Sequence, residues 1–280
     1  MLRALYSALT WCAQPLLRRK LARRGRVEPG YLEAIDERFG RYQGLPPASE
    51  RQGLLWIHAV SLGETRAAAI LLAALRERDP GLRVLLTHGT ATGREEGRRL
   101  LRPGDLQAWL PWDTPGAVAR FLDGFNPAAG VLMETEVWPN LVAACAARGV
   151  PLALANARLN ERSLARGKRL APLSRPAFGA LAAVWAQTEA DAARLRAAGA
   201  RVDGVFGNLK FDATPDPDQR ARGNAWRVRL GRPVLMLANN HESEERLWIE
   251  AWRACRRADP MLASSVQWLV VPRHPQRFDE

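Results

Sequence analysis

Short apolar runs alternate with segments of helical spacing along most of this chain. Residues 54–60 form an apolar run without period-2 alternation, which predicts a strand buried on both faces of a parallel sheet, and residues 65–72 then take up helical spacing. The same pattern predicts further strands at residues 83–87, 106–110, 129–133, 152–156, 183–187 and 202–207. Helical stretches lie between nearly all of them, at residues 66–78, 93–101, 117–125, 138–148 and 189–198. This rhythm is typical of an α/β protein with a Rossmann-like sheet.

Residues 212–218 are rich in proline and aspartate, which predicts a linker between two lobes. Beyond the linker, the pattern predicts a helix at residues 219–230, a strand at 233–238, a helix at 242–257 and a strand at 266–271. Two strands and two helices leave a sheet edge exposed and a core half built. We therefore expect an N-terminal Rossmann-like domain at residues 27–212 and a partial second one at residues 213–280, in a chain shortened from a longer protein.

The first 26 residues predict a helix that associates with a membrane. Residues 2–17 are largely apolar and include tyrosine and tryptophan, and six basic residues follow between positions 18 and 26. The apolar part is too short and too polar for a comfortable span, and it lacks the features of a secretory signal. A helix lying in the bilayer surface, with its arginines on anionic headgroups, fits this pattern. An amphipathic helix that docks on the protein body is the alternative.

The charge is strongly basic, with 41 Lys and Arg against 29 Asp and Glu in 280 residues, a net charge of +12. Such an excess favours a polyanionic partner, although an arginine-rich composition without functional meaning is an alternative. The three cysteines and four histidines are scattered, so their spacing predicts neither a disulfide framework nor a metal site. No module or interleaving of aromatic and basic residues points to nucleic acid.

Polar motifs follow several of the expected strands. Glu64 comes directly after the first strand and opens a helix, where it is either a site carboxylate at the ligand-binding edge of the sheet or an acid favoured by the helix dipole. Residues 87–93 could bring backbone N–H groups to an anion or form a plain turn. Glu134 and Glu136 lie beside a helix start, as site carboxylates or as caps. Arginines follow the fifth strand, and Lys210 lies at the junction between the lobes.

Five motifs, in order along the chain, resemble those of the 3-deoxy-D-manno-octulosonic acid (Kdo) transferases, which add Kdo to the lipid A precursor in lipopolysaccharide synthesis. They are His-Ala-Val-Ser-Leu-Gly-Glu at 58–64, Glu-Thr-Glu-Val-Trp-Pro-Asn at 134–140, Asn-Ala-Arg-Leu at 156–159, Gly-Asn-Leu-Lys-Phe-Asp at 207–212 and Val-Pro-Arg-His-Pro at 271–275. The resemblance implies a GT-B fold of two Rossmann-like lobes, the second incomplete here, preceded by an N-terminal membrane-associated helix. It implies that the C-terminal lobe mainly holds CMP-Kdo and the N-terminal lobe the lipid acceptor.

The resemblance also implies residue roles in an inverting transfer that uses no metal and no cofactor. Glu64 maps onto the general base that takes a proton from the acceptor hydroxyl. Glu134 and Lys210 map onto residues that stabilise the transition state. Pro272 and Arg273 map onto contacts with CMP-Kdo. Further substrate contacts are expected at Ser61, Gly63, Thr92, Asn156, Arg158, His241 and Glu242.

The chain departs from the family pattern at Arg94, where a serine is common, in one motif of the second lobe and in its length. Asn239 and Asn240 replace a Ser-Thr pair, Ser243 replaces a glycine, and family members continue well past residues 271–275. The expected function is transfer of Kdo from CMP-Kdo to lipid IVA at the cytoplasmic face of the inner membrane. The alternative is an inactive fragment that binds membrane or lipid. The expected partners are CMP-Kdo, the phosphorylated lipid A precursor and the anionic membrane surface, without nucleic acid.

Overall fold

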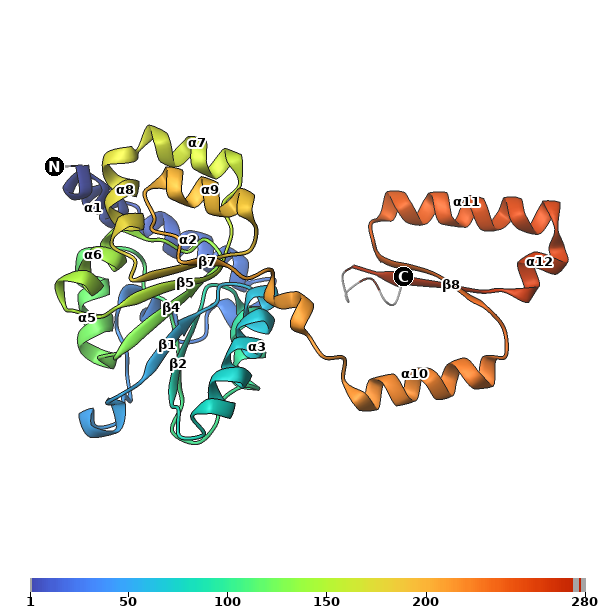
Figure 1. The fold of residues 1–280 in the computed structure, drawn as a ribbon, viewed down its shortest axis with the longest axis horizontal. Helices are drawn as coiled ribbons and strands as arrows, with labels where there is room; N and C mark the ends of the chain where they lie inside the picture. The colour runs from blue at the N-terminus through green and yellow to red at the C-terminus, as the bar shows by residue number, and fades with distance from the viewer. Residues whose placement is uncertain (1, 274–276, 278–280) are drawn as a thin grey trace. The chain divides into compact units, whose positions relative to one another are not determined.

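The chain folds into two units, Met1–Ala213 and Thr214–Glu280, and each is described by itself. The computed structural model describes residues 2–273 and residue 277 (Figure 1). His274 and Pro275, which the sequence analysis placed in the last motif, lie outside the described residues.

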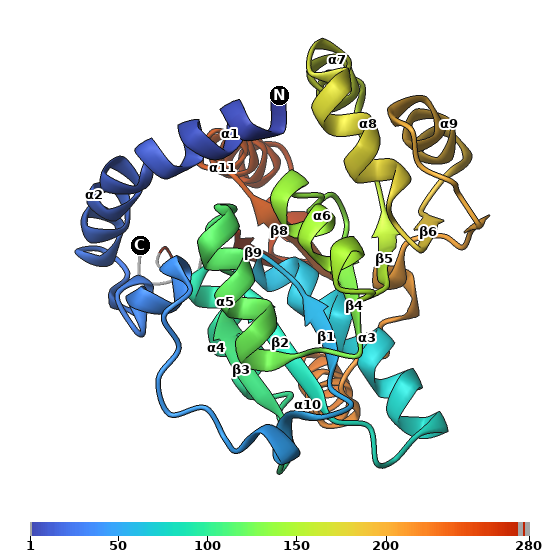
Figure 2. The same ribbon diagram turned by 90° about the vertical axis from the view of Figure 1, so that its left-hand side faces the viewer.

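A wholly parallel sheet forms the centre of the first unit, with the strand order β3-β2-β1-β4-β5-β6-β7. Figure 2 shows this order from β3 to β6. Its strands are β1 (Leu55–His58), β2 (Val84–His88), β3 (Leu106–Trp109), β4 (Ala129–Met133), β5 (Leu152–Ala157), β6 (Ala183–Ala186) and β7 (Gly204–Val205). The expected strands and the α/β fold class are confirmed, with β7 reduced to two residues. In a Rossmann sheet of this order, the winding reverses between β1 and β4, and ligands bind outside the carboxyl ends of the strands at that point.

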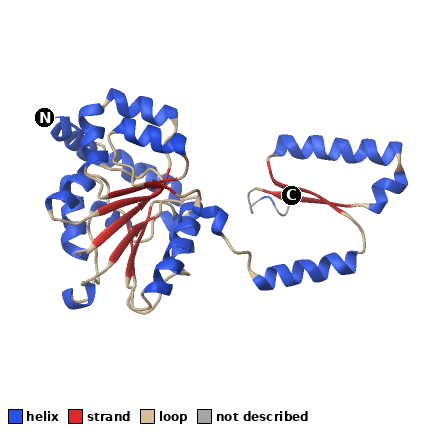
Figure 3. Cartoon of the chain, in the orientation of Figure 1, coloured by secondary structure: helices blue, strands red, loops and turns tan. Residues whose placement is uncertain are grey.

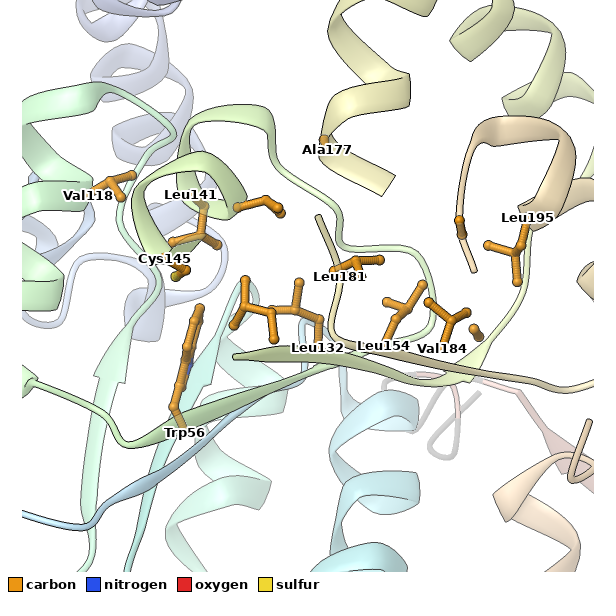
Figure 4. Packing of buried hydrophobic residues seen from close by; sticks show 14 of the residues in the cluster. Trp56, Val118, Leu132, Leu141, Cys145, Leu154, Ala177, Leu181, Val184 and Leu195 are labelled. Carbon is orange, nitrogen blue, oxygen red and sulfur yellow. The ribbon is translucent and has the colours of Figure 1, made fainter. Parts of the chain in front are cut away.

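The strands of this sheet are buried on both faces. Trp56 of β1 belongs to the larger core cluster, whereas its neighbour Ile57 belongs to a second cluster on the opposite face. Figure 3 shows the strands in red at the centre of the unit with helices around them. Figure 4 shows Trp56 and Leu132 of the sheet pointing toward Leu141, which lies on a covering helix. Burial on both faces explains why the apolar runs show no alternation.

The helices of the first unit cover these two faces. The larger cluster includes residues of α5 (Pro115–Phe125), α6 (Pro139–Ala147), α8 (Ala171–Gly179) and α9 (Glu189–Ala198). The second cluster includes residues of α3 (Leu62–Arg78), which packs against α4 (Ala91–Arg98). The pattern had not predicted α8 or α7 (Glu161–Arg169), because α7 buries no residue and α8 carries Pro176 in its interior.

Two helices, α1 (Leu2–Cys12) and α2 (Gln14–Gly25), precede the sheet, followed by the short helices η1 (Pro29–Tyr31), η2 (Ile35–Phe39) and η3 (Ala48–Arg51). Helix α1 docks on the body through its polar side chains. The Tyr6 hydroxyl donates to Asp113 at 2.9 Å, and the Ser7 hydroxyl donates to Asn140 at 3.0 Å. Its apolar side chains remain outside, with Leu5 57% and Leu9 61% exposed. Among residues 2–273 and 277, no helix has the length and apolar character needed to cross a bilayer.

The second unit consists of α10 (Pro217–Leu230), β8 (Val234–Asn240), α11 (Glu242–Ala258), α12 (Pro260–Ser265) and β9 (Gln267–Pro272). Strands β8 and β9 pair in parallel, as a βαβ connection requires. Trp248 of α11 meets Trp268 of β9 edge to face, with ring centroids 5.1 Å apart. The expected elements are present, and α12 is an additional turn of helix.

Candidate functional site

Glu64 lies where the chain leaves β1 and enters α3. Ser61 caps α3 by accepting a hydrogen bond from the backbone N–H of Glu64, and its hydroxyl donates to Glu64 Oε1 at 3.0 Å. The other carboxylate oxygen, Oε2, accepts from the backbone N–H of Val60 at 2.8 Å. Burial raises the pKa of Glu64, and these two hydrogen bonds partly offset that effect. The carboxylate is therefore held in one orientation, in an environment that makes it more basic than usual.

Glu134 follows β4 and is the most buried carboxylate of this group, with 4% of its surface exposed. Its backbone has a φ of +58°, a left-handed conformation that costs energy for a residue other than glycine. Its side chain forms ion pairs with Arg158 Nε at 2.6 Å and with Lys210 Nζ at 3.5 Å. The negative charge of Glu134 also raises the pKa of Glu64, so the two groups are electrostatically coupled.

Asn156, at the end of β5, positions the segment that carries Lys210. It too has a positive φ, of +51°, which asparagine tolerates better than most residues. Its side-chain oxygen accepts from the backbone N–H of Leu209 at 3.2 Å, at the start of η4 (Leu209–Asp212). A Cβ atom added at Gly63 would lie 3.8 Å from Lys210 Nζ. The ammonium group thus lies beside the first turn of α3, between the segments that carry Glu64 and Glu134.

Glu136 is a further carboxylate of this cluster, to which the sequence analysis gave no catalytic role. Its Oε2 accepts from the indole N–H of Trp138 at 2.9 Å. Burial, and then the charges of Glu64 and Glu134, raise the pKa of Glu136 to about 7. The signal in the sequence was a second acid two residues after Glu134, but its environment depends on burial that the sequence does not show.

The capping interpretation of Glu134 and Glu136 is wrong, because another residue satisfies the start of α6. Asp113, in the loop after β3, accepts from the backbone N–H groups of Asn140 at 3.0 Å and Leu141 at 2.8 Å. Asp113 also holds Tyr6 of α1, and burial raises the pKa of its carboxyl group. Sequence reasoning missed Asp113, since nothing in its neighbourhood along the chain indicates a partner so distant.

The segment 87–93 packs against the end of β1 rather than joining the carboxylates. The Thr90 hydroxyl donates to the backbone oxygen of Val60 at 2.9 Å, and a Cβ at Gly93 would meet the same oxygen at 2.8 Å. Glycine is therefore required at this close approach. Thr92 is exposed and lines a separate hollow of about 250 Å³ together with Arg98.

The predicted residues of the second unit lie together at the carboxyl ends of β8 and β9. Arg273 Nη1 lies 3.3 Å from His241 Nε2, directly after Pro272 ends β9. Glu242 begins α11 and forms an exposed ion pair with Arg246. Asn239 adopts a positive φ of +60°, and the side chain of Asn240 is buried against Glu245. Asn239 thus lies where the register between β8 and β9 shifts, between Ala238 and Asn240.

Comparison with known proteins identifies the family of this chain. A family model described as 3-deoxy-D-manno-octulosonic-acid transferase matches residues 33–213, which include every predicted site residue of the first unit. The chain belongs to the Kdo transferase family. It is 47% identical to a 3-deoxy-D-manno-octulosonic acid transferase of Bordetella pertussis and 30% identical to one of Haemophilus influenzae, over 99% and 100% of this chain. The chain spans 65% of the length of each of these Kdo transferases.

A solved structure supports the GT-B fold class of this Kdo transferase family member. A UDP-GlcNAc 2-epimerase from Neisseria meningitidis, bound to UDP-GlcNAc, superposes with a TM-score of 0.52 at 13% identity, over 78% of this chain and 65% of the epimerase. At this identity the likeness concerns the fold alone. Within residues 2–273 and 277, no group of three or more His, Cys, Asp or Glu side chains is arranged to hold a metal ion.

Proposed function

We propose that the full-length protein transfers Kdo from CMP-Kdo to the phosphorylated lipid A precursor, lipid IVA, with inversion at the anomeric carbon. Membership of the Kdo transferase family supports the reaction class. The observation that carries the residue roles is the grouping of Glu64, Glu134 and Lys210 at the switch point of the sheet, where Lys210 pairs with Glu134. Neither a metal nor a cofactor takes part in the proposed reaction.

Glu64 is the proposed general base. Its carboxylate takes the proton of an acceptor hydroxyl while that oxygen forms a bond to the anomeric carbon of Kdo. The bond from this carbon to the phosphate oxygen of CMP breaks, and CMP leaves with the electron pair. The raised pKa of Glu64 suits this role, because a stronger base takes the proton more readily near neutral pH.

Lys210 and Glu134 form the proposed electrostatic part of the site. Lys210 would offset negative charge on the Kdo carboxylate or the leaving phosphate, and Glu134 fixes its ammonium group at 3.5 Å. Arg158, more than half exposed, pairs with the same carboxylate and is available to an anionic substrate group. Removing Glu134 would free both cations and change the charge of the site by one unit.

The remaining expected residues divide between the two substrates in this proposal. On the acceptor side, Ser61 and Gly63 shape the first turn of α3, and Asn156 holds the Lys210 segment. Pro272 and Arg273 would hold CMP-Kdo, with Arg273 on the phosphate. The remaining candidate contacts are Thr92, His241 and Glu242.

A membrane surface is the proposed location of the enzyme, on the cytoplasmic face of the inner membrane. An amphipathic helix normally buries its apolar side, whereas α1 uses its polar side chains to dock and leaves Leu5 and Leu9 exposed. That orientation favours an apolar medium over water. The double variant Leu5→Ser/Leu9→Ser should lose binding to anionic vesicles, while Val228→Ser, at an apolar residue outside α1 that is even more exposed, should keep it. Equal binding by all three proteins would refute the surface role of α1.

A transfer assay tests the proposed reaction. CMP-Kdo and lipid IVA are incubated with the chain, with a version extended by a complete second lobe, and with Glu64→Gln in each background. We expect transfer by the extended protein and a loss of about 10²- to 10⁴-fold on Glu64→Gln. Transfer that does not depend on Glu64 would contradict the general-base role. Vesicle binding without transfer in both backgrounds would favour the lipid-binding alternative.

A further inference from the structure

A cavity of about 310 Å³ lies in the first unit, between α2 and the loops that follow β1, β2, β3 and β4. Its volume falls at the lower end of the range of small-molecule sites. Three cations from α2 and η2, Lys20, Arg24 and Arg38, line it together with the carboxylates of Asp113 and Glu136. None of the three cations has a role in the reaction proposed above. Lys20 and Arg24 belong to the basic cluster that the sequence predicts on anionic lipid headgroups, and in the structure they line a cavity.

Arg38 is held in one position in the wall of this cavity. Its side chain is 9% exposed, its guanidinium lies 3.7 Å from the ring centroid of Trp109, and Nη2 donates to the backbone oxygen of Gly89 at 3.1 Å. Its Nε has no hydrogen-bond partner among the described residues. A buried cation with an unused donor is costly unless an anion approaches it. Arg24, on the last turn of α2, lies 4.8 Å over the ring of Tyr31 in the same wall.

His58 is a second buried side chain with a polar atom that makes no hydrogen bond. Its Nδ1 lies 2.9 Å from the Thr87 hydroxyl, while its Nε2 has no partner in the described part of the chain. Burial lowers the pKa of His58 to about 3, so the ring is neutral near pH 7. At Nε2 a neutral imidazole either donates or accepts one hydrogen bond, depending on its tautomer.

Aromatic and acidic side chains complete the lining. The rings of Trp112 and Trp138 lie 6.4 Å apart, and Trp138 donates to Glu136. Both oxygens of Asp113 already accept hydrogen bonds from Tyr6 and from the start of α6. Of the two carboxylates, Glu136 is therefore the one that can accept a further hydrogen bond. Apolar ring faces, a hydroxyl acceptor and fixed cations are together the chemistry that recognises a sugar carrying a phosphate.

We propose that this cavity binds one phosphorylated sugar ring, with Lys20 and Arg24 of α2 on the phosphate and Glu136 on a ring hydroxyl. This rests on the proposed function and deepens it, because a phosphorylated sugar is the reacting end of the proposed acceptor. Helix α2 is then part of the substrate site. The cavity also shares Val60 and Glu136 with the surroundings of Glu64, which brings the ring close to the general base.

Binding of soluble sugar phosphates by the full chain tests the proposal without transfer. Isothermal titration compares glucosamine 1-phosphate, glucosamine 6-phosphate, glucosamine and inorganic phosphate. Arg24→Gln is the test variant, and Arg23→Gln is the matched control, because Arg23 is a neighbouring exposed cation of α2 that lines a different hollow. We expect Arg24→Gln to weaken binding of at least one sugar phosphate about 10- to 100-fold, as the loss of a charged hydrogen bond does. Arg23→Gln should change it less than about twofold.

Several outcomes would overturn the proposal. Equal weakening of sugar-phosphate binding by both variants would show that the positive charge of α2 as a whole, rather than Arg24, attracts the ligand. Equal affinity for inorganic phosphate and for the sugar phosphates would show that no sugar ring is recognised. Failure of the unmodified chain to bind either sugar phosphate would also refute the proposal. Vesicles of phosphatidylglycerol and phosphatidylcholine form the last arm: weakening of vesicle binding by Arg24→Gln, with sugar-phosphate binding unchanged, would assign the cation to lipid headgroups.

The transfer assay separates this proposal from the proposed function. If the extended enzyme transfers Kdo and Arg24→Gln leaves the KM for the acceptor unchanged, the cavity proposal fails and the function stands. If transfer is absent but sugar-phosphate binding depends on Arg24, the cavity proposal stands and the function fails.

Discussion

Replacing Glu136 with glutamine should remove a pH dependence from the stability of this protein. The pKa of Glu136 rises from 4.5 to about 7 on folding, because of burial first and the charge of Glu64 second. Between these values the folded protein holds a proton that the unfolded chain has released, so stability falls as pH rises through that window. The difference corresponds to about 3 kcal/mol, an upper limit because the side chain is only partly buried.

Urea unfolding followed by tryptophan fluorescence, at several pH values from 4 to 8, measures this effect. Glutamine keeps the size of the side chain and an oxygen that accepts from Trp138. We expect the two proteins to be equally stable near pH 4, and Glu136→Gln to be more stable by up to about 3 kcal/mol near pH 8. In a Glu64→Gln background the upper limit of this pH window should fall, since one cause of the raised folded-state pKa is gone. A stability difference that stays constant from pH 4 to pH 8 would refute the reasoning.

Other predictions concern the stability of the first unit and the reactivity of its cysteines. Asp113→Ala should lower the free energy of unfolding by about 3 kcal/mol or more in the same urea assay, because it leaves the first amides of α6 without a buried partner. Asn156→Ala should cost about 1–2 kcal/mol and increase hydrogen exchange around Lys210, whereas Asn156→Gly should cost less if the positive φ is the main demand. Cys12, which is exposed, should react rapidly with a thiol reagent at pH 8, while Cys145, whose pKa burial raises, should react only on unfolding.

The layered fold was predictable because its signal is local. Each strand of the sheet is a short apolar run, and both-face burial of Trp56 and Ile57 leaves that run without alternation. Helix α7 was not predictable in this way, since it is polar on all sides but for Leu164. The motif residues at strand ends were found because parallel strands present their carboxyl ends at one edge.

The geometry between those motifs was not predictable, because it depends on partners distant in sequence. Glu134 meets Arg158 and Lys210 only after β5 has formed beside β4 and η4 has returned to the sheet. The positive φ of Asn156 and the pairing of Asp113 with Tyr6 likewise have no signature in neighbouring residues. The raised pKa of Glu136 follows from packing and from two nearby charges rather than from its position in the motif.

Asp113 couples the docking of α1 to the ordering of the loop that precedes α6. One of its oxygens accepts from Tyr6 on α1 and from the first buried amide of α6, directly after the loop that carries Glu134 and Glu136. If α1 rests on a membrane as proposed, free energy that the bilayer contributes to holding α1 in place also orders this loop. Thermodynamic linkage makes the relation mutual: a ligand that orders the loop must strengthen attachment to the bilayer by the same factor. The enzyme would then be retained at the surface most strongly while its acceptor is bound.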